Sequence, residues 1–203
     1  VPPKVAAIRR ESISEESVTL RWSQSAGATQ YQIEQSTEGS AFVPVLTVGG
    51  GELSTTVGGL SPGTAYTFQI RAVNAGGASD ATTLFGQLTI PAAPFDVTLS
   101  LETQNYQAGV RINFQGVKGA SSYVIERAST GREFARLVTL PAGTTSYFDF
   151  QVYPGDTFDY RVKAVNESGS SQFSDVVSIF VPDAPSQLPT PANLALSRTD
   201  SAA

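Results

Sequence analysis

Residues 60–77 decide the fold of this chain, and they read LSPGTAYTFQIRAVNAGG. After a Pro-Gly turn, the apolar residues Tyr66, Phe68, Ile70 and Ala72 alternate with polar ones. Alternation with a period of two places successive side chains on opposite faces of a β-strand, so one face is buried and the other meets water. The Asn-Ala-Gly-Gly cluster that closes the stretch is typical of a turn. The stretch therefore predicts a long, half-buried strand between two turns.

The same pattern returns 92 residues later, where residues 152–169 read VYPGDTFDYRVKAVNESG. Residues 18–79 align with residues 110–171 without a gap, and eighteen of the 62 aligned pairs (79 − 18 + 1) are identical. A constant offset over this length indicates two copies of one structural unit. Residues 191–197, PANLALS, also resemble residues 94–100, PFDVTLS. A third copy therefore begins near the C-terminus, or this segment is a free tail.

Proline-bordered links separate the units, because Pro91 and Pro94 stand at one junction and Pro182 and Pro185 at the other. Proline fixes its own φ and biases the preceding residue toward extended conformations, which makes such links short and stiff. We expect one module at residues 1–91, a second at 94–182, and a linker with the first strand of a possible third module, or a tail, at 183–203. The chain does not begin with Met, so we also expect a fragment or processed product of a longer array.

Each unit is expected to fold as an all-β, antiparallel sandwich with seven strands and no helix. Without any cysteine, each sandwich must be held by packing alone. The predicted core of the first unit is made of Val18, Leu20, Trp22, Tyr31, Ile33, Leu60, Phe68, Ile70 and Ala72. Its strands are predicted near residues 5–10, 17–23, 30–36, 42–48, 53–57, 65–74 and 80–90.

Composition excludes several classes of function. The chain has no His, Cys or Met, which rules out Ser-His and Cys-His catalysis and the usual zinc and haem ligands. Its net charge is −5 and no basic cluster is present, so we expect no nucleic-acid partner. No apolar run is long enough to cross a bilayer, so we expect no direct membrane insertion. We predict no catalytic residue, no metal site and no cofactor.

At this point the residues resemble a known family, the fibronectin type III domain. The resemblance is carried by residues 60–66 and 68–74, by Trp22 on the second strand and by Tyr31 on the third, and it extends over both copies. It implies two tandem, immunoglobulin-like, seven-stranded sandwiches. It also implies a tyrosine corner, in which the hydroxyl of Tyr66 bonds to the backbone of the preceding loop.

The second copy departs from this pattern at two core positions. Phe114 replaces the core tryptophan, and Phe158 takes the tyrosine-corner position without a hydroxyl. We therefore predict that the second module lacks the corner bond, or that Tyr160 or Asp156 replaces it.

The loop between the last two strands is the candidate partner site, because this resemblance implies that partners often use it. It spans about residues 74–80 in the first module and 166–174 in the second, where Phe173 is an aromatic anchor. The candidate contact residues are Asn74, Gly76, Gly77, Ser79, Asn166, Gly169, Ser171 and Phe173.

Other features allow weaker hypotheses. Asp149, Asp156 and Asp159 flank one turn and leave calcium binding open. Carbohydrate binding would need exposed aromatic platforms, for which Tyr106, Tyr147 and Tyr153 are the candidates.

The tripeptide Asn166-Glu167-Ser168 fits the N-glycosylation pattern. Its counterpart Asn74 is not in such a tripeptide, so we expect the asparagine to serve the end of the strand.

The function expected from these observations is non-catalytic. The tandem would be a spacer or stalk in an extracellular surface or adhesin-like protein, with two modules reaching roughly 65–70 Å end to end. The alternative is an accessory region of a secreted polysaccharide-degrading enzyme. The expected partners are neighbouring modules of the same chain and protein or glycan at the cell surface, and the extracellular or cell-surface location follows from the resemblance.

Overall fold

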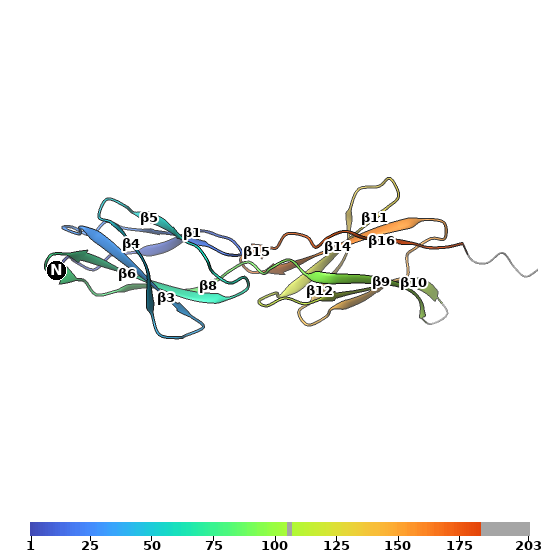
Figure 1. The fold of residues 1–203 in the computed structure, drawn as a ribbon, viewed down its shortest axis with the longest axis horizontal. Helices are drawn as coiled ribbons and strands as arrows, with labels where there is room; N and C mark the ends of the chain where they lie inside the picture. The colour runs from blue at the N-terminus through green and yellow to red at the C-terminus, as the bar shows by residue number, and fades with distance from the viewer. Residues whose placement is uncertain (105–106, 184–203) are drawn as a thin grey trace, which may run out of the picture.

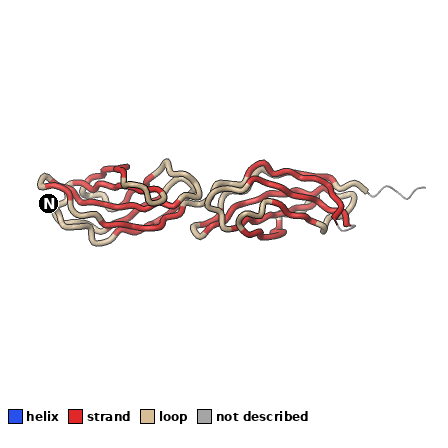
Figure 2. The backbone as a smooth tube through the Cα atoms, turned by 90° about the horizontal axis from the view of Figure 1, so that it is seen from below, coloured by secondary structure: helices blue, strands red, loops and turns tan. Residues whose placement is uncertain are grey.

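A computed structural model describes residues 1–104 and 107–183, which form two β-sandwiches arranged end to end (Figures 1 and 2). These residues contain strands and turns but no helix, which confirms the expected all-β fold. Accordingly, the described part of the chain offers no helix with the length and hydropathy needed to cross a membrane. The possible third module, Tyr106 and most of the 183–203 segment fall outside the described residues.

The first sandwich pairs a three-stranded sheet, in the order β1-β2-β5, with a five-stranded sheet. In the second sheet the order is β4-β3-β6, and β7 and β8 both pair with β6. All of these pairs are antiparallel. The strands are β1 (Ile8–Ile13), β2 (Val18–Trp22), β3 (Gln30–Thr37), β4 (Val43–Gly49), β5 (Ser54–Val57), β6 (Ala65–Asn74), β7 (Gly77–Ala78) and β8 (Thr82–Leu88).

The second sandwich repeats this topology with β13-β10-β9 as one sheet and β12-β11-β14 as the other. Here β15 and β16 pair with β14, as β7 and β8 pair with β6. The strands are β9 (Phe95–Gln104), β10 (Gln107–Gln115), β11 (Ser122–Ser129), β12 (Ala135–Pro141), β13 (Ser146–Asp149), β14 (Thr157–Asn166), β15 (Gly169–Ser170) and β16 (Val177–Phe180).

Two predicted strands differ from the observed ones. The first strand was expected at residues 5–10 but runs from Ile8 to Ile13, because the preceding segment leaves the ladder and buries Val5 completely in the core. The last strand was expected as one piece at residues 80–90. It is found as β8 at Thr82–Leu88, while the two-residue β7 lies in the segment predicted as a loop, and the buried Ser79 stands between them.

Every predicted core residue of the first module is buried, and each module has its own apolar core. In the first core, the rings of Trp22 and Tyr31 meet edge to face with centroids 5.5 Å apart. In the second, Phe114 and Tyr123 do the same at 5.0 Å. The exchange of tryptophan for phenylalanine therefore keeps a favourable aromatic geometry.

The tyrosine corner is present in the first module, where the Ser61 N–H donates to the Tyr66 hydroxyl at 2.9 Å. In the second module, the buried Phe158 makes no such bond, as predicted. The hydroxyl is instead carried two residues later by Tyr160, which donates to the Asp149 carboxylate at 2.9 Å. Asp149 in turn accepts a bond from the Gln151 N–H at 3.0 Å, so the corner backbone is still held, through a carboxylate.

Candidate functional site: the junction between the modules

The two candidate loops lie at the same end of their modules, the end at which each module begins, so only the second loop faces another module. The first loop is next to the N-terminal residue, because a Cβ atom on Gly76 would lie 2.7 Å from the Val1 nitrogen. The second loop contains β15, which Figure 1 places at the middle of the molecule, where the two sandwiches meet.

In the first loop, the candidate residues hold the loop together. The Asn74 side chain accepts a bond from the Gly76 N–H at 2.8 Å and donates to the Gly27 carbonyl at 3.1 Å. The buried Ser79 hydroxyl accepts from the Ala72 N–H at 3.0 Å. Gly77 has a φ of 116°, which glycine adopts readily. All of these bonds stay within the first module.

In the second loop, the equivalent asparagine reaches across to the other module. Asn166 closes the same kind of turn, accepting from the N–H groups of Ser168 at 2.9 Å and Gly169 at 3.2 Å. Its side-chain amide, however, donates to the Thr89 carbonyl of the first module at 2.8 Å. The Ser168 hydroxyl donates to the neighbouring Leu88 carbonyl. The loop thus donates hydrogen bonds to two backbone carbonyls of the first module, one at the last residue of β8 and one at the residue after it.

Two glycines let the module backbones touch at the same junction. A Cβ atom on Gly119 would lie 2.5 Å from the Gly63 Cα, closer than real Cβ contacts allow. Both residues also have positive φ, 58° and 71°, which glycine adopts without strain. Any larger residue at Gly119 would separate the two modules.

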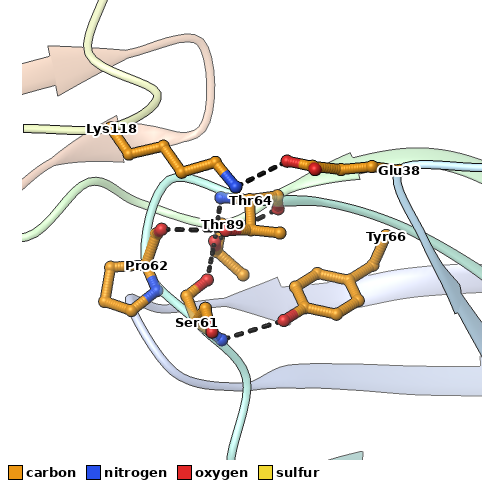
Figure 3. A network of polar contacts seen from close by, with 7 residues as sticks. All are labelled: Glu38, Ser61, Pro62, Thr64, Tyr66, Thr89 and Lys118. Atoms are coloured by element: carbon orange, nitrogen blue, oxygen red, sulfur yellow. Dashed lines mark hydrogen bonds and ion pairs between the residues drawn. The ribbon is translucent and has the colours of Figure 1, made fainter.

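One ion pair spans the junction, between the Lys118 ammonium and a Glu38 carboxylate oxygen at 2.6 Å (Figure 3). Both side chains are more than half exposed, so the pair stabilises the junction by about 1 kcal/mol or less. Glu38 holds a positive φ of 50° in the turn that presents it. The ion pair therefore orients the modules more than it binds them.

The surface that receives Asn166 is itself fixed by a polar network, drawn in Figure 3. The fully buried Thr89 donates its hydroxyl to the Ser61 carbonyl at 2.8 Å and accepts from the Thr64 N–H at 2.9 Å. Ser61 is the residue whose N–H bonds to Tyr66. The tyrosine corner, the turn after it and the Thr89 carbonyl thus form one connected unit, and such a satisfied network is rigid.

Comparisons with known proteins agree with this architecture. Residues 2–84 match the fibronectin type III domain family. A two-module fibronectin type III segment of chicken tenascin superimposes with a TM-score of 0.53 and 18% identity, covering 89% of this chain and 99% of that one. The two sandwiches therefore have the fold of a tandem fibronectin type III segment. The FN1–FN3 segment of chicken CNTN1 matches with a TM-score of 0.48 and 24% identity, covering 89% of this chain and 67% of that one.

Two candidate residues of the second module lie beside the junction but make bonds within their own module. The Ser171 hydroxyl accepts from the Ala164 N–H at 2.9 Å. The Phe173 ring is stacked on Arg161, whose guanidinium carbon lies 3.9 Å from the ring centroid, and the Lys163 ammonium lies 4.7 Å from it. Arg161 also forms an ion pair with Glu126 at 2.6 Å. The Phe173 ring is therefore held in place by contacts within its own module.

The three carboxylates that left calcium binding open have separate surroundings. Asp149 is 1% exposed, and its oxygens accept bonds from Arg127 at 2.7 Å and from Tyr160. Asp159 instead accepts a bond from the Ser178 hydroxyl at 2.5 Å. No group of His, Cys, Asp or Glu suited to a metal ion occurs among the described residues.

Burial and the nearby charge of Asp149 raise the pKa of Tyr160 far above its ordinary value. The same two causes, in the same order, raise the pKa of the half-buried Tyr147 more modestly. Of the three tyrosines named as candidates for carbohydrate binding, Tyr106 lies outside the described residues and Tyr147 is half-buried. Tyr153 is 67% exposed and is the one most open to a ligand.

Sequence reasoning named Asn166 but missed most of the junction. No sequence motif marks the contacts across the junction. The Thr89 carbonyl is a backbone acceptor, which has no sequence signal, and no pattern in the sequence pairs Gly63 with Gly119 or Lys118 with Glu38. One signal was available: within otherwise matching loops, Lys118 replaces Ala26 and Ser168 replaces Gly76. The second module thus gains polar side chains at loop positions that face the first module.

Proposed function

We propose that this tandem is a non-catalytic spacer that fixes the distance and direction between parts of an extracellular or cell-surface protein. The observation that carries the proposal is the junction, where Asn166 and Ser168 of one module bond to the backbone carbonyls of Thr89 and Leu88 of the other. A freely jointed pair of modules would need no such bonds. Relative motion is the default for domains that share a small interface, and these bonds oppose it.

The link between the modules supports the same function. Pro91 and Pro94 border it, and both are buried. Because proline restricts both its own backbone and that of the preceding residue, the link has few conformations to lose when the junction closes. The entropy cost of docking the modules is correspondingly small.

Direct measurement of the inter-module distance tests this function. The chain has no cysteine, so single cysteines at the exposed, equivalent positions Thr47 and Thr139 can each carry a spin label. A pulsed dipolar measurement is expected to give one narrow distance distribution for T47C/T139C. A broad or multiply peaked distribution would contradict a spacer of fixed direction.

A further inference from the structure

A groove of about 500 Å³ opens on the second module, between residues 93–97 and residues 173–177. This volume is within the range of ordinary ligand sites. The groove lies beside β9 and β16, the strands at which the two sheets of this sandwich end. Within the described residues, β9 pairs only with β10, and β16 pairs only with β14. Unpaired strand edges are the surfaces on which proteins bind extended peptides.

The first module closes the equivalent gap with its own side chains. There, Val5 is fully buried in the core, and the Thr82 hydroxyl donates to the Val5 carbonyl, tying the two edges together. In the second module, Ser174 takes the place of Thr82 (82 + 92), and its hydroxyl donates to the Asp175 carbonyl instead.

The register of the strands shows which residue stands at the position of Val5. Phe95 pairs with Gln115, just as Ala7 accepts a bond from the equivalent Ser23. Counted back from this pair, Val5 corresponds to Ala93, whose smaller side chain is only partly buried, while the neighbouring Pro94 is buried. The groove thus lies where the second module has an alanine in place of the first module's buried valine.

Aromatic and acidic residues both line the groove. Phe95 is 55% exposed, and the Phe173 ring is held in place by Arg161 and Lys163. Asp96 and Asp175 are exposed, and neither forms an ion pair with any residue that the structure describes. A pre-ordered aromatic anchor lowers the entropy cost of binding.

Asp96 also holds a φ of 51°, at the point where β9 shifts register against β10. Aspartate adopts this left-handed conformation more readily than most residues.

We propose that this groove binds an extended segment of a partner protein that carries a Lys or Arg next to an apolar residue. The cation lies between Asp96 and Asp175, and the apolar side chain packs against Phe95 and Phe173. The two carboxylates select against acidic segments, since like charges at such a site repel.

The test begins with an array of immobilised hexapeptides whose third residue is Lys or Arg and whose neighbours are apolar, beside a matched array with Glu at that position. The full chain is expected to bind members of the basic array only. Amide shifts in nuclear magnetic resonance spectra of the labelled chain should then map the best peptide to residues 93–97 and 173–177. Shifts confined to other residues, or no binding to the basic array, would overturn the proposal.

Three variants then examine the site itself. A93V installs the valine of the first module and should weaken peptide binding tenfold or more, by roughly the loss of one well-filled contact. D96N/D175N keeps the shape, since Asn tolerates positive φ, and should weaken binding roughly fivefold. D80N, an exposed carboxylate of the first module, should leave binding unchanged.

Because thermal unfolding shows whether each variant is folded, a loss of binding in a folded variant supports the site. Equal binding by A93V and the unaltered chain contradicts it. One further outcome overturns the peptide proposal: the chain binds a glycan array, A93V weakens that binding, and no basic peptide binds. The groove would then be a carbohydrate site.

Discussion

A single hydroxyl group occupies different places in the two modules. In the first, Tyr66 uses it to hold the Ser61 backbone, and in the second, Tyr160 uses it to hold the Asp149 carboxylate. At this corner the first module has the sequence Tyr66-Thr67-Phe68, and the second has Phe158-Asp159-Tyr160. The consequence is that equivalent tyrosine substitutions must be made two residues apart to have equivalent effects.

The substitution Tyr66→Phe should destabilise the first module by about 1–2 kcal/mol, because it leaves the Ser61 N–H without its protein partner. Denaturant unfolding with Trp22 as the fluorescent probe measures this loss, since Trp22 lies in the first core. Phe85→Leu is the control within the same module, as its side chain is 73% exposed and its change should stay within about 0.5 kcal/mol. Equal effects of the two variants would show that the corner bond contributes nothing.

The raised pKa of Tyr160 makes stability depend on pH on the alkaline side. Burial, and then Asp149, favour the neutral phenol in the folded state, so the folded pKa is above that of an unfolded tyrosine, about 10. The stabilisation is therefore fully present below about pH 10 and is lost as the pH rises above it. Unfolding of the second module, followed from pH 8 to 12, should show this decline.

In the variant Tyr160→Phe, the alkaline decline should become shallower. The part that remains is due to Tyr147, whose pKa is raised in the same direction. An unchanged slope would mean that Tyr160 ionises as easily in the folded state as in the unfolded chain.

Three strands of the second module differ from their counterparts in a coordinated way. Arg127 on β11, Asp149 on β13 and Tyr160 on β14 form a buried polar cluster. The equivalent positions of the first module hold Gln35, Val57 and Phe68. The cluster therefore replaces apolar packing with a charge pair, and a buried pair of this kind costs desolvation that its mutual attraction must offset.

Removing one partner of the cluster should lower the free energy of unfolding far more than exchanging all three residues. Asp149→Ala leaves Arg127 partly buried without its counter-ion and should cost about 3–5 kcal/mol. The triple exchange R127Q/D149V/Y160F installs the residues of the first module and should recover most of that loss. Urea unfolding of both variants measures this, and a triple variant as unstable as Asp149→Ala would contradict the reading.

Most strand positions could be predicted, because alternation of apolar and polar residues depends only on nearest neighbours in the chain. The buried positions from Val18 to Ala72 follow from the same pattern. The first strand was misplaced because Val5 is apolar and buried without belonging to a ladder. The partner of Asn166 could not be predicted, because the Thr89 carbonyl is 77 residues away in the chain and has no side-chain signature.

At the scale of the whole molecule, one asparagine behaves differently in two copies. Asn74 bonds within its own module, to the Gly27 carbonyl, whereas Asn166 bonds to the preceding module. Both side chains also accept a bond from the N–H two residues further on, that of Gly76 and that of Ser168. This pair provides a matched comparison in which the local turn and the contact between modules can be separated.

Asn166→Ala should broaden the distance distribution between labels at Thr47 and Thr139, because the amide that bonds to Thr89 is lost. Asn74→Ala, which removes the same kind of turn in the first loop, should leave the distribution narrow. Pulsed dipolar spectroscopy of both variants provides the measurement. Equal widths in the two variants would assign the fixed geometry to the proline-bordered link alone.

The position of Asn166 also affects the choice of host cell for producing this protein. Its amide nitrogen is engaged with Thr89 and the residue is only 7% exposed, yet its tripeptide fits the acceptor pattern for oligosaccharide transfer. A sugar attached in the secretory pathway before folding would occupy the space that Thr89 needs. Material from yeast or animal cells and material from bacteria would then differ in the bend between the sandwiches, although both share one amino-acid sequence.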